Sequence, residues 1–380
     1  MIYFDNAATT FPKPETVYKA IDEYLRSYCG NPGRSGHRLS LHSGRVLLEA
    51  RELLSELFNT SSPDRIVFTL NATDSVNIAL KGYLSSGDHI IMTSMEHNAV
   101  ARPVKQLEHI GVENTIVQCD EQGRLNTEDI KKAFKQNTKL LVATHASNVT
   151  GTIMPIYEMG KLAAENNIKF MVDAAQTSGV YDIDVKKMNI NILVFTGHKS
   201  LYGVPGVGGL YIDESVDLIP VRVGGTGSYS ESLLQPEIYP DRLESGTPNT
   251  PGIVGLCEGI RFINKTGIEN IRKHEEDLTR YFINELKNID DIKIYGPEEI
   301  SEHAPVVSIN IGNIGSSEMS YMLDSSFNIA TRPGLHCSPL AHRTIGTLQQ
   351  GTVRFSFGYF NTKDEIREAI DAINTIVREI

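Results

Sequence analysis

From about residue 66 to residue 196, the sequence alternates short apolar runs with amphipathic stretches, and this pattern constrains the fold more than any other feature. Continuous apolar runs of four or five residues are typical of strands that are covered on both faces. The stretches between them, such as 100–110 and 156–166, have helical periodicity. This alternation predicts an α/β domain with a mostly parallel sheet. The expected strands are 66–70, 89–93, 140–144, 170–173 and 192–195.

The pattern changes after about residue 251. Two helical patterns, 252–264 and 267–287, come first, shorter elements follow, and a last helix is expected at 363–379. The segment 246–252 is rich in glycine and proline and predicts a joint. At roughly 150 residues per domain, 380 residues predict two domains. We expect a large domain at 15–250 and a smaller α+β domain at 251–380, with segment 1–14 packed near the second.

Charge and composition exclude several classes of function. The net charge of −11 disfavours nucleic acid as a partner. No apolar run approaches the roughly 18 residues of a membrane helix, and no secretory signal is evident, so we expect no membrane partner. Four cysteines without a C-x-x-C pair predict neither a disulfide framework nor a zinc site. No metal is therefore expected, and a reducing cytoplasm fits best.

Polar residues follow the predicted strands, at the sheet edge where α/β proteins bind ligands. Thr73 lies where a helix begins after the first strand, which favours an anion, although an ordinary helix cap is the simpler interpretation. An aspartate at the end of an apolar strand needs a cationic partner. A lysine there would be partly desolvated, which makes it a candidate for Schiff-base chemistry. The residues after the other strands are His97, Asn148, Asp173 with Gln176, and Thr196 with His198 and Lys199.

Each signal is weak alone, but together they match what pyridoxal 5'-phosphate requires. The lysine would bind the cofactor covalently, and the carboxylate would keep the pyridine nitrogen protonated, so that the ring withdraws electrons. A histidine can stack on the ring, and a helix N-terminus can take the phosphate. Competing phosphate motifs are poorly supported. The sequence lacks G-x-x-x-x-G-K-[ST], and the glycines at 203–209 lack the G-x-G-x-x-G spacing after a strand.

These residues also carry a resemblance to a known family. The chain resembles the class V aminotransferase superfamily, in its branch of cysteine desulfurases and selenocysteine lyases with a short cysteine loop. The resemblance covers nearly the whole chain and implies a type I pyridoxal-phosphate fold and a homodimer. The motifs are Tyr-Phe-Asp-Asn-Ala-Ala-Thr-Thr at 3–10, Glu-His at 96–97, Ser-Asn-Val-Thr-Gly at 147–151, Asp-Ala-Ala-Gln at 173–176, Thr-Gly-His-Lys at 196–199, Glu-Ser-Gly-Thr-Pro-Asn at 244–249, Arg-Pro-Gly-Leu-His-Cys at 332–337 and Val-Arg at 353–354.

The resemblance implies a role for each candidate residue. Lys199 would carry the cofactor and act in catalysis with Asp173, His97 and Cys337. Gln176 would contact the ring hydroxyl. The phosphate would be held by Thr73, Thr196 and His198, with Thr247 from a second subunit. Substrate binding would use Asn148, Arg354, Arg332 and His37, and Asn148 would also contact the cofactor.

Cys337 decides the expected reaction. Cys119 and Cys257 fit the ordinary role of buried apolar residues, whereas Cys337 lies in a loop bounded by proline and glycine, beside Arg332. The sequence therefore predicts a cysteine desulfurase that converts L-cysteine to L-alanine and leaves a persulfide on Cys337. A selenocysteine lyase and a class V aminotransferase remain alternatives. A sulfur or selenium acceptor protein is a candidate partner.

Overall fold

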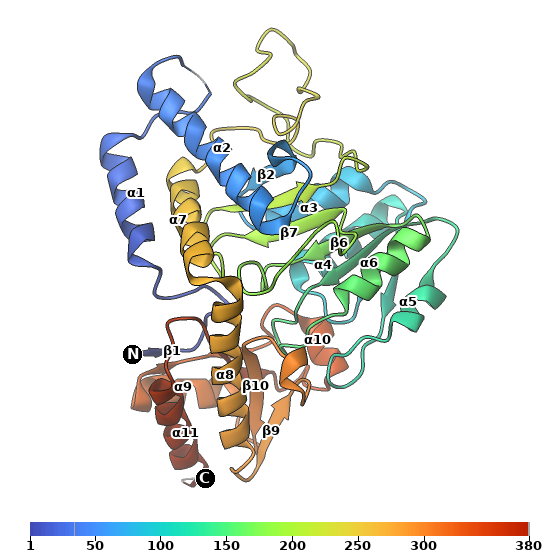
Figure 1. The fold of residues 1–380 in the computed structure, drawn as a ribbon. Coiled ribbons are helices and arrows are strands. Elements are labelled where there is room, and N and C mark those ends of the chain that lie inside the picture. Colours follow the sequence, from blue (N-terminus) through green and yellow to red (C-terminus); the bar gives the residue numbers. More distant parts are fainter. Residues whose placement is uncertain (34, 379–380) are drawn as a thin grey trace.

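The computed structural model describes residues 1–33 and 35–378, and a seven-stranded sheet is the largest element of this part of the chain (Figure 1). The strand order is β2-β8-β7-β6-β5-β3-β4. All neighbours pair in parallel except β8, which runs antiparallel to both β2 and β7. The strands are β2 Ile66–Thr69, β3 His89–Thr93, β4 Glu113–Val117, β5 Thr138–Thr144, β6 Lys169–Asp173, β7 Ile192–Thr196 and β8 Gly208–Ile212.

The α/β fold predicted from the apolar runs is confirmed, and the five expected strands are β2, β3, β5, β6 and β7. Two strands of the sheet were not predicted. The edge strand β4 leaves most of its side chains partly exposed, so its sequence lacks an apolar run. The strand β8 begins with Gly208 and Gly209, which resemble a loop in the sequence. A Cβ at Gly208 would lie 2.6 Å from the backbone of Asn71, so the absent side chain lets β8 pass beneath the start of a helix.

Helices cover both faces of this sheet and make it the middle of three layers (Figure 1). The helices α3 and α4 pack on one face through Val76, Leu80, Val100 and Val104. The other face is covered by α2, α6 and α7. The bounds are α1 Glu15–Ser27, α2 Arg38–Phe58, α3 Ala72–Tyr83, α4 Asn98–Leu107, α5 Thr127–Ala133, α6 Ile156–Glu165 and α7 Thr250–Thr266.

The C-terminal part forms a second, antiparallel sheet in the order β12-β13-β10-β9, with its own hydrophobic cluster. Its strands are β9 Ile292–Tyr295, β10 Val306–Ile311, β12 Arg332–Gly334 and β13 Thr352–Ser356. The helices are α8 Ile268–Leu286, α9 Ser316–Phe327, α10 Pro339–Thr344 and α11 Lys363–Arg378. The helix expected at 363–379 and the domain expected at 251–380 both end outside the described residues.

The N-terminal segment joins this second part of the molecule. The strand β1, Ile2–Tyr3, pairs in parallel with β11, Ile329–Ala330. Asp5 then forms a bridge with Ser356 in β13, and Phe4 is fully buried in the C-terminal cluster. The position of segment 1–14 next to the smaller domain stays a prediction that these contacts favour. The division near residue 250 also stays a prediction, and α7, which follows it, packs against the large sheet.

Glu275 is a buried carboxylic acid between the two sheets. It lies on α8, is 3 % exposed, and borders a small cavity of about 20 Å³ together with Tyr202 and Phe357. Burial raises the pKa of Glu275 from its ordinary 4.5 to about 8, and a backbone hydrogen bond from Tyr359 opposes the shift. The acid is therefore neutral in the folded protein at neutral pH.

We expect Glu275→Gln to stabilise the protein at high pH. A raised pKa means that the contribution of Glu275 to stability is full below pH 4.5 and is lost as the pH rises toward about 8. Glutamine keeps the neutral shape without binding a proton, so the variant should melt several degrees above wild type at about pH 8 and at the same temperature near pH 4.5. Thermal unfolding across this range measures the difference.

The matched control is Glu276→Gln on the same helix, where the side chain is partly exposed and paired with Arg280. The melting temperature of this control, relative to that of wild type, should not increase as the pH rises. A Glu275→Gln variant less stable than wild type at every pH would contradict the neutral state of this acid.

The helices of the described residues include none that is long and apolar enough to cross a membrane.

Candidate active site

A cavity of about 220 Å³ opens at the carboxyl ends of β5, β6 and β7 and at the start of α3 and α4. Its location follows from the parallel sheet, because the carboxyl ends of neighbouring strands lie along the same edge. The structure brings most of the predicted site residues together in its wall. They are Thr73, His97, Asn148, Asp173, Gln176, Thr196, His198, Lys199, Arg332 and Arg354.

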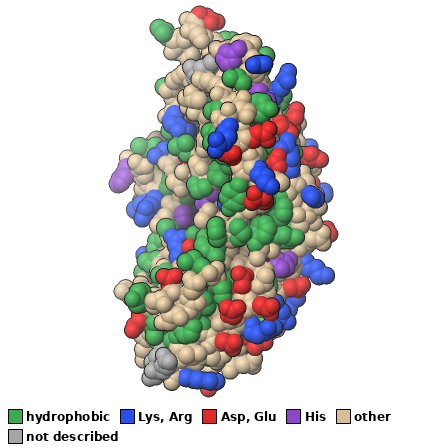
Figure 2. All heavy atoms as spheres, turned by 90° about the vertical axis from the view of Figure 1, so that its left-hand side faces the viewer, with side chains coloured by type: hydrophobic (Ala, Val, Ile, Leu, Met, Phe, Trp, Pro, Cys, Tyr) green, Lys and Arg blue, Asp and Glu red, His purple; other side chains and the backbone are tan. Residues whose placement is uncertain are grey.

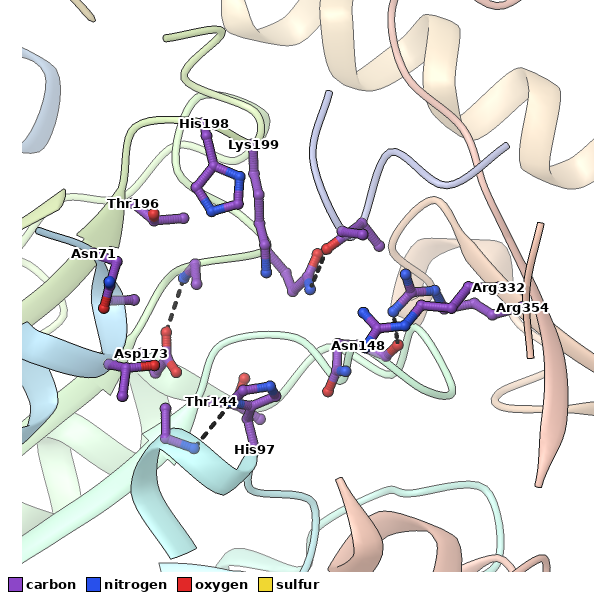
Figure 3. Close-up of a pocket in the computed structure, with 17 residues that line it drawn as sticks. Asn71, His97, Thr144, Asn148, Asp173, Thr196, His198, Lys199, Arg332 and Arg354 are labelled. Carbon is purple, nitrogen blue, oxygen red and sulfur yellow. Dashed lines mark hydrogen bonds between the residues drawn. The ribbon is translucent and has the colours of Figure 1, made fainter. Parts of the chain in front are cut away.

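Lys199 and Asp173 occupy the interior of this cavity (Figure 3). Desolvation lowers the pKa of Lys199 to about 8, and Arg354 and Arg332 contribute, while Asp173 opposes the shift. Asp173 ends β6, is 4 % exposed, and accepts a hydrogen bond from the backbone N–H of Ala175 at 3.0 Å. Burial raises the pKa of Asp173, and Lys199 partly offsets this. The cavity thus holds an amine that can lose its proton near neutral pH and a carboxylate that needs a cationic partner.

One end of the cavity suits an anion. Thr196 Oγ1 and His198 Nδ1 are buried, and neither has a hydrogen-bond partner within 1–33 and 35–378. The helix α3 begins beside them, with Asn71 as its cap and Thr73 in its first turn. Figure 3 shows Asn71, Thr196 and Asp173 on one side of Lys199 and the two arginines on the other. Unpaired polar atoms at a helix N-terminus are what a phosphate group requires.

His97 caps α4 and presents its ring to the cavity (Figure 3). Its Nδ1 accepts a hydrogen bond from the backbone N–H of Ala99 at 3.0 Å. Desolvation lowers the pKa of His97 to about 4, and Lys199, Arg332, Arg354 and Arg102 lower it further. The ring is therefore neutral at physiological pH and carries its proton on Nε2.

Arg354 and Arg332 lie together at the other end (Figure 3). Arg354, in β13, is fully buried, forms an ion pair with Asp5 at 2.5 Å, and donates to the carbonyl of Asn148 at 3.2 Å. Its Nε has no partner among the atoms that the structure describes. Asp5 was not singled out from the sequence, because 349 residues separate it from Arg354. The N-terminal segment thus orients an arginine that could bind a carboxylate.

Cys337 lies outside the cavity wall, in an exposed position beside it. It lines an adjoining groove that shares Thr73, His97 and Ala99 with the cavity. Arg332 Nη2 lies 3.5 Å from Cys337 Sγ, so the arginine connects the cavity with the thiol. We expected both residues to line one pocket, but Arg332 lines the cavity and Cys337 lines the groove, and they meet where the two adjoin.

Asn148 holds the loop that carries Cys337. Its Nδ2 donates to the carbonyl of His336 at 2.7 Å, and its Oδ1 accepts from the hydroxyl of Ser338 at 2.7 Å. The backbone N–H of Asn98 donates to the Cys337 carbonyl at 2.8 Å. Both amide functions of Asn148 thus support the loop, a role that the sequence did not indicate.

The sequence analysis also did not identify a pair of neutral histidines that supports the loop carrying Cys337. His336 Nε2 donates to the carbonyl of Arg332 at 2.9 Å, and Nδ1 faces His342 Nε2 at 3.3 Å. The Nδ1 of His342 in turn meets the hydroxyl of Thr347 at 2.7 Å. Burial lowers the pKa of His336 to about 2 and that of His342 to about 4. This chain of hydrogen bonds supports the backbone at His336 and Cys337, where φ is +49° and +59°. These values lie in the left-handed region, which residues other than glycine disfavour.

Two predicted residues lie away from the cavity of their own chain. Thr247 lines a separate pocket of about 80 Å³ beside Glu244. His37 caps α2 by accepting a hydrogen bond from the backbone N–H of Ser40 at 3.2 Å, and it is exposed. A contribution of Thr247 to the site of a second subunit and of His37 to substrate binding stay predictions. The described residues contain no cluster of three or more histidine, cysteine or acidic side chains that could hold a metal.

Comparison with known proteins settles the family. The model of the aminotransferase class-V family matches residues 2–368, nearly the whole chain. The chain belongs to this family. A relative named probable cysteine desulfurase, from Methanothermobacter thermautotrophicus, is 35 % identical over 96 % of this chain and 92 % of its own length. The cysteine desulfurase of Haloferax volcanii is 31 % identical over 98 % of this chain and 89 % of its own length.

Solved structures of the family share the fold over the whole chain. The apo cysteine desulfurase of Thermococcus onnurineus is 33 % identical and superposes with a TM-score of 0.95, covering 100 % of this chain and 95 % of that structure. The fold class and the resemblance to the class-V aminotransferase family, with cysteine desulfurases as relatives, are therefore confirmed.

Proposed function

We propose that this class-V family member is a pyridoxal-phosphate-dependent cysteine desulfurase. The observation that carries the proposal is the arrangement of one lysine, one buried carboxylate and two arginines in one cavity, with an exposed cysteine 3.5 Å from one of those arginines. The reaction of an aminotransferase does not require a thiol in this position. The names of the relatives agree with this assignment.

The residues present fit pyridoxal phosphate. Lys199 would hold it covalently, Asp173 would pair with its ring nitrogen, and His97 would lie against its ring. Thr196 Oγ1 and His198 Nδ1, which have no hydrogen-bond partner among the described residues, would bind the phosphate together with the first turn of α3. Gln176 would contact the ring hydroxyl. The bound cofactor would supply an electron sink for the charge that develops at the substrate α-carbon.

The chain's own residues would perform the remaining steps. Arg354, already oriented by Asp5, would bind the substrate carboxylate with Arg332 beside it. Lys199, with its pKa lowered to about 8, is suited to accept the α-proton. The Cys337 thiolate would attack the substrate sulfur. As the new sulfur–sulfur bond forms, the carbon–sulfur bond breaks, and the carbon fragment takes up protons and leaves as alanine.

One experiment separates this reaction from its alternatives. The purified holoprotein is incubated with L-cysteine or L-selenocysteine without any keto acid, and alanine is measured. We expect alanine from L-cysteine together with sulfide when a reducing thiol is present. Alanine from selenocysteine alone would identify a selenocysteine lyase. Product that requires an added keto acid would identify an aminotransferase and contradict the proposal.

We further propose a cytoplasmic homodimer. The four cysteines are all free, which suits a reducing compartment. Exposed apolar side chains lie on α1 and α2, among them Leu25, Leu41 and Leu48, and Leu233 and Leu234 protrude from the loop that follows β8. Figure 2 shows apolar side chains gathered on one face of the molecule. Such surfaces are typical of contacts between subunits.

A further inference from the structure

The groove beside Cys337 is large enough for a small molecule. It has a volume of about 490 Å³ and is bordered by α3 and α4, with Cys337 at its edge. Small-molecule sites in proteins commonly have volumes of roughly 300–1,000 Å³. Since the groove shares His97 and Thr73 with the cavity, a molecule bound in it would lie beside the thiol without entering the cofactor site.

The groove carries positive charge that no acidic side chain among the described residues neutralises. Arg102 on α4 lines it, is exposed, and forms no ion pair with any residue that the structure describes. Lys105, further along the same helix, contrasts with it, because Lys105 is paired with Glu108 at 2.5 Å. Arg332, in the wall of the adjoining cavity, likewise has no carboxylate partner within the described ranges, and it contacts Cys337 Sγ. No aspartate or glutamate of the described part of the chain lines the groove.

This local charge is opposite to that of the whole protein. The chain has a net charge of −11, yet Arg102 and Arg332 both act on the neighbouring His97 as cations. A positive groove on an acidic protein concentrates small anions and repels small cations. The groove also exposes the sulfur of Cys337, so a small molecule that approaches this sulfur passes the positive charge.

We propose that this groove binds a small thiol that carries a negative group, such as a carboxylate or sulfonate, and that this thiol removes the sulfur from Cys337. The inference rests on the proposed function, since it requires a persulfide on Cys337. The acceptor thiolate would attack the outer sulfur of the persulfide. The sulfur–sulfur bond to Cys337 breaks, the Cys337 thiolate leaves, and the acceptor departs as a persulfide. The exchange needs no oxidant or reductant.

The test follows the discharge of a persulfide formed in advance. The holoprotein is loaded with L-cysteine, desalted, and checked by mass spectrometry for a persulfide on Cys337. Loss of that persulfide is then timed with 2-mercaptoethanesulfonate, 2-mercaptoethanol and cysteamine, which are anionic, neutral and cationic. Rates are compared at equal thiolate concentrations. Three proteins are used: wild type, Arg102→Gln, and the matched control Lys105→Gln.

We expect the anionic thiol to discharge wild type and Lys105→Gln about fivefold faster than the neutral thiol, and the cationic thiol to be slowest. Arg102→Gln should lose most of this preference while its rate with the neutral thiol stays the same. High salt should also reduce the preference in wild type. Equal preference in wild type and Arg102→Gln, or none in wild type, would overturn the inference while the persulfide still supports the proposed function. Absence of any persulfide would overturn both.

Discussion

Replacing Lys199 by alanine should abolish desulfurase activity and the covalent attachment of pyridoxal phosphate. No other lysine of residues 1–33 and 35–378 lines the cavity, so no second amine there can hold the cofactor or take the substrate proton. The loss of the proton acceptor alone should cost at least about 10²–10⁴-fold in rate. Alanine formation gives the activity, and borohydride reduction followed by peptide mapping gives the site of attachment.

Lys13 is the informative control. Burial lowers its pKa to about 8, as in Lys199, and its Nζ donates to the backbone carbonyl of His198 at 2.6 Å. It therefore lies close to the site without lining the cavity. Lys13→Ala should keep the reducible adduct, whereas Lys199→Ala should not. An adduct that maps to Lys13, or that survives in Lys199→Ala, would show that the assignment of the lysine is wrong.

Replacing Cys337 by alanine should stop the desulfuration of cysteine after substrate has bound. The variant lacks the nucleophile that attacks the substrate sulfur, and water in the exposed groove is not held there to replace it. We expect a loss of at least about 10²-fold in alanine formation from cysteine. Selenocysteine should lose much less, since selenium is the better leaving group. The cofactor absorbance should match that of wild type.

Cys29→Ala is the matched control, because Cys29 is also exposed and lies outside the cavity and the groove. It should desulfurate cysteine at the wild-type rate. If Cys337→Ala did the same, the sulfur would not pass through this thiol, and the reaction would resemble that of a lyase or a transaminase.

Much of the fold was predictable because a strand that is buried on both faces has a continuous apolar sequence. The strands β3, β6 and β7 are apolar throughout their interiors, and their predicted positions agree with the structure. The strand β4 escaped prediction because an edge strand tolerates polar side chains. In β8, Gly208 and Gly209 avoid close contacts with Asn71 and Phe195 rather than form a turn, and only the tertiary structure shows this.

The cavity was predictable for a related reason. Side chains that follow parallel strands must meet at one edge, so Asp173, Thr196 and Lys199 could be placed together from their order alone. Contacts between distant segments could not be placed in this way. The pairing of Arg354 with Asp5 and the support of the Cys337 loop by Asn148 both depend on how the C-terminal part docks against the large sheet. The position of Cys337 in the groove, and not in the cavity wall, also depends on how the C-terminal part docks.

The most direct test of the central claim is to locate the sulfur after a single exposure to substrate. Wild-type holoprotein is incubated with L-cysteine without a reducing thiol, alkylated, digested and analysed by mass spectrometry. We predict that one additional sulfur atom is found on the peptide containing Cys337, with alanine released in equal amount, and that the peptides of Cys29, Cys119 and Cys257 are unchanged. Alanine released with no additional sulfur on Cys337 would contradict the account.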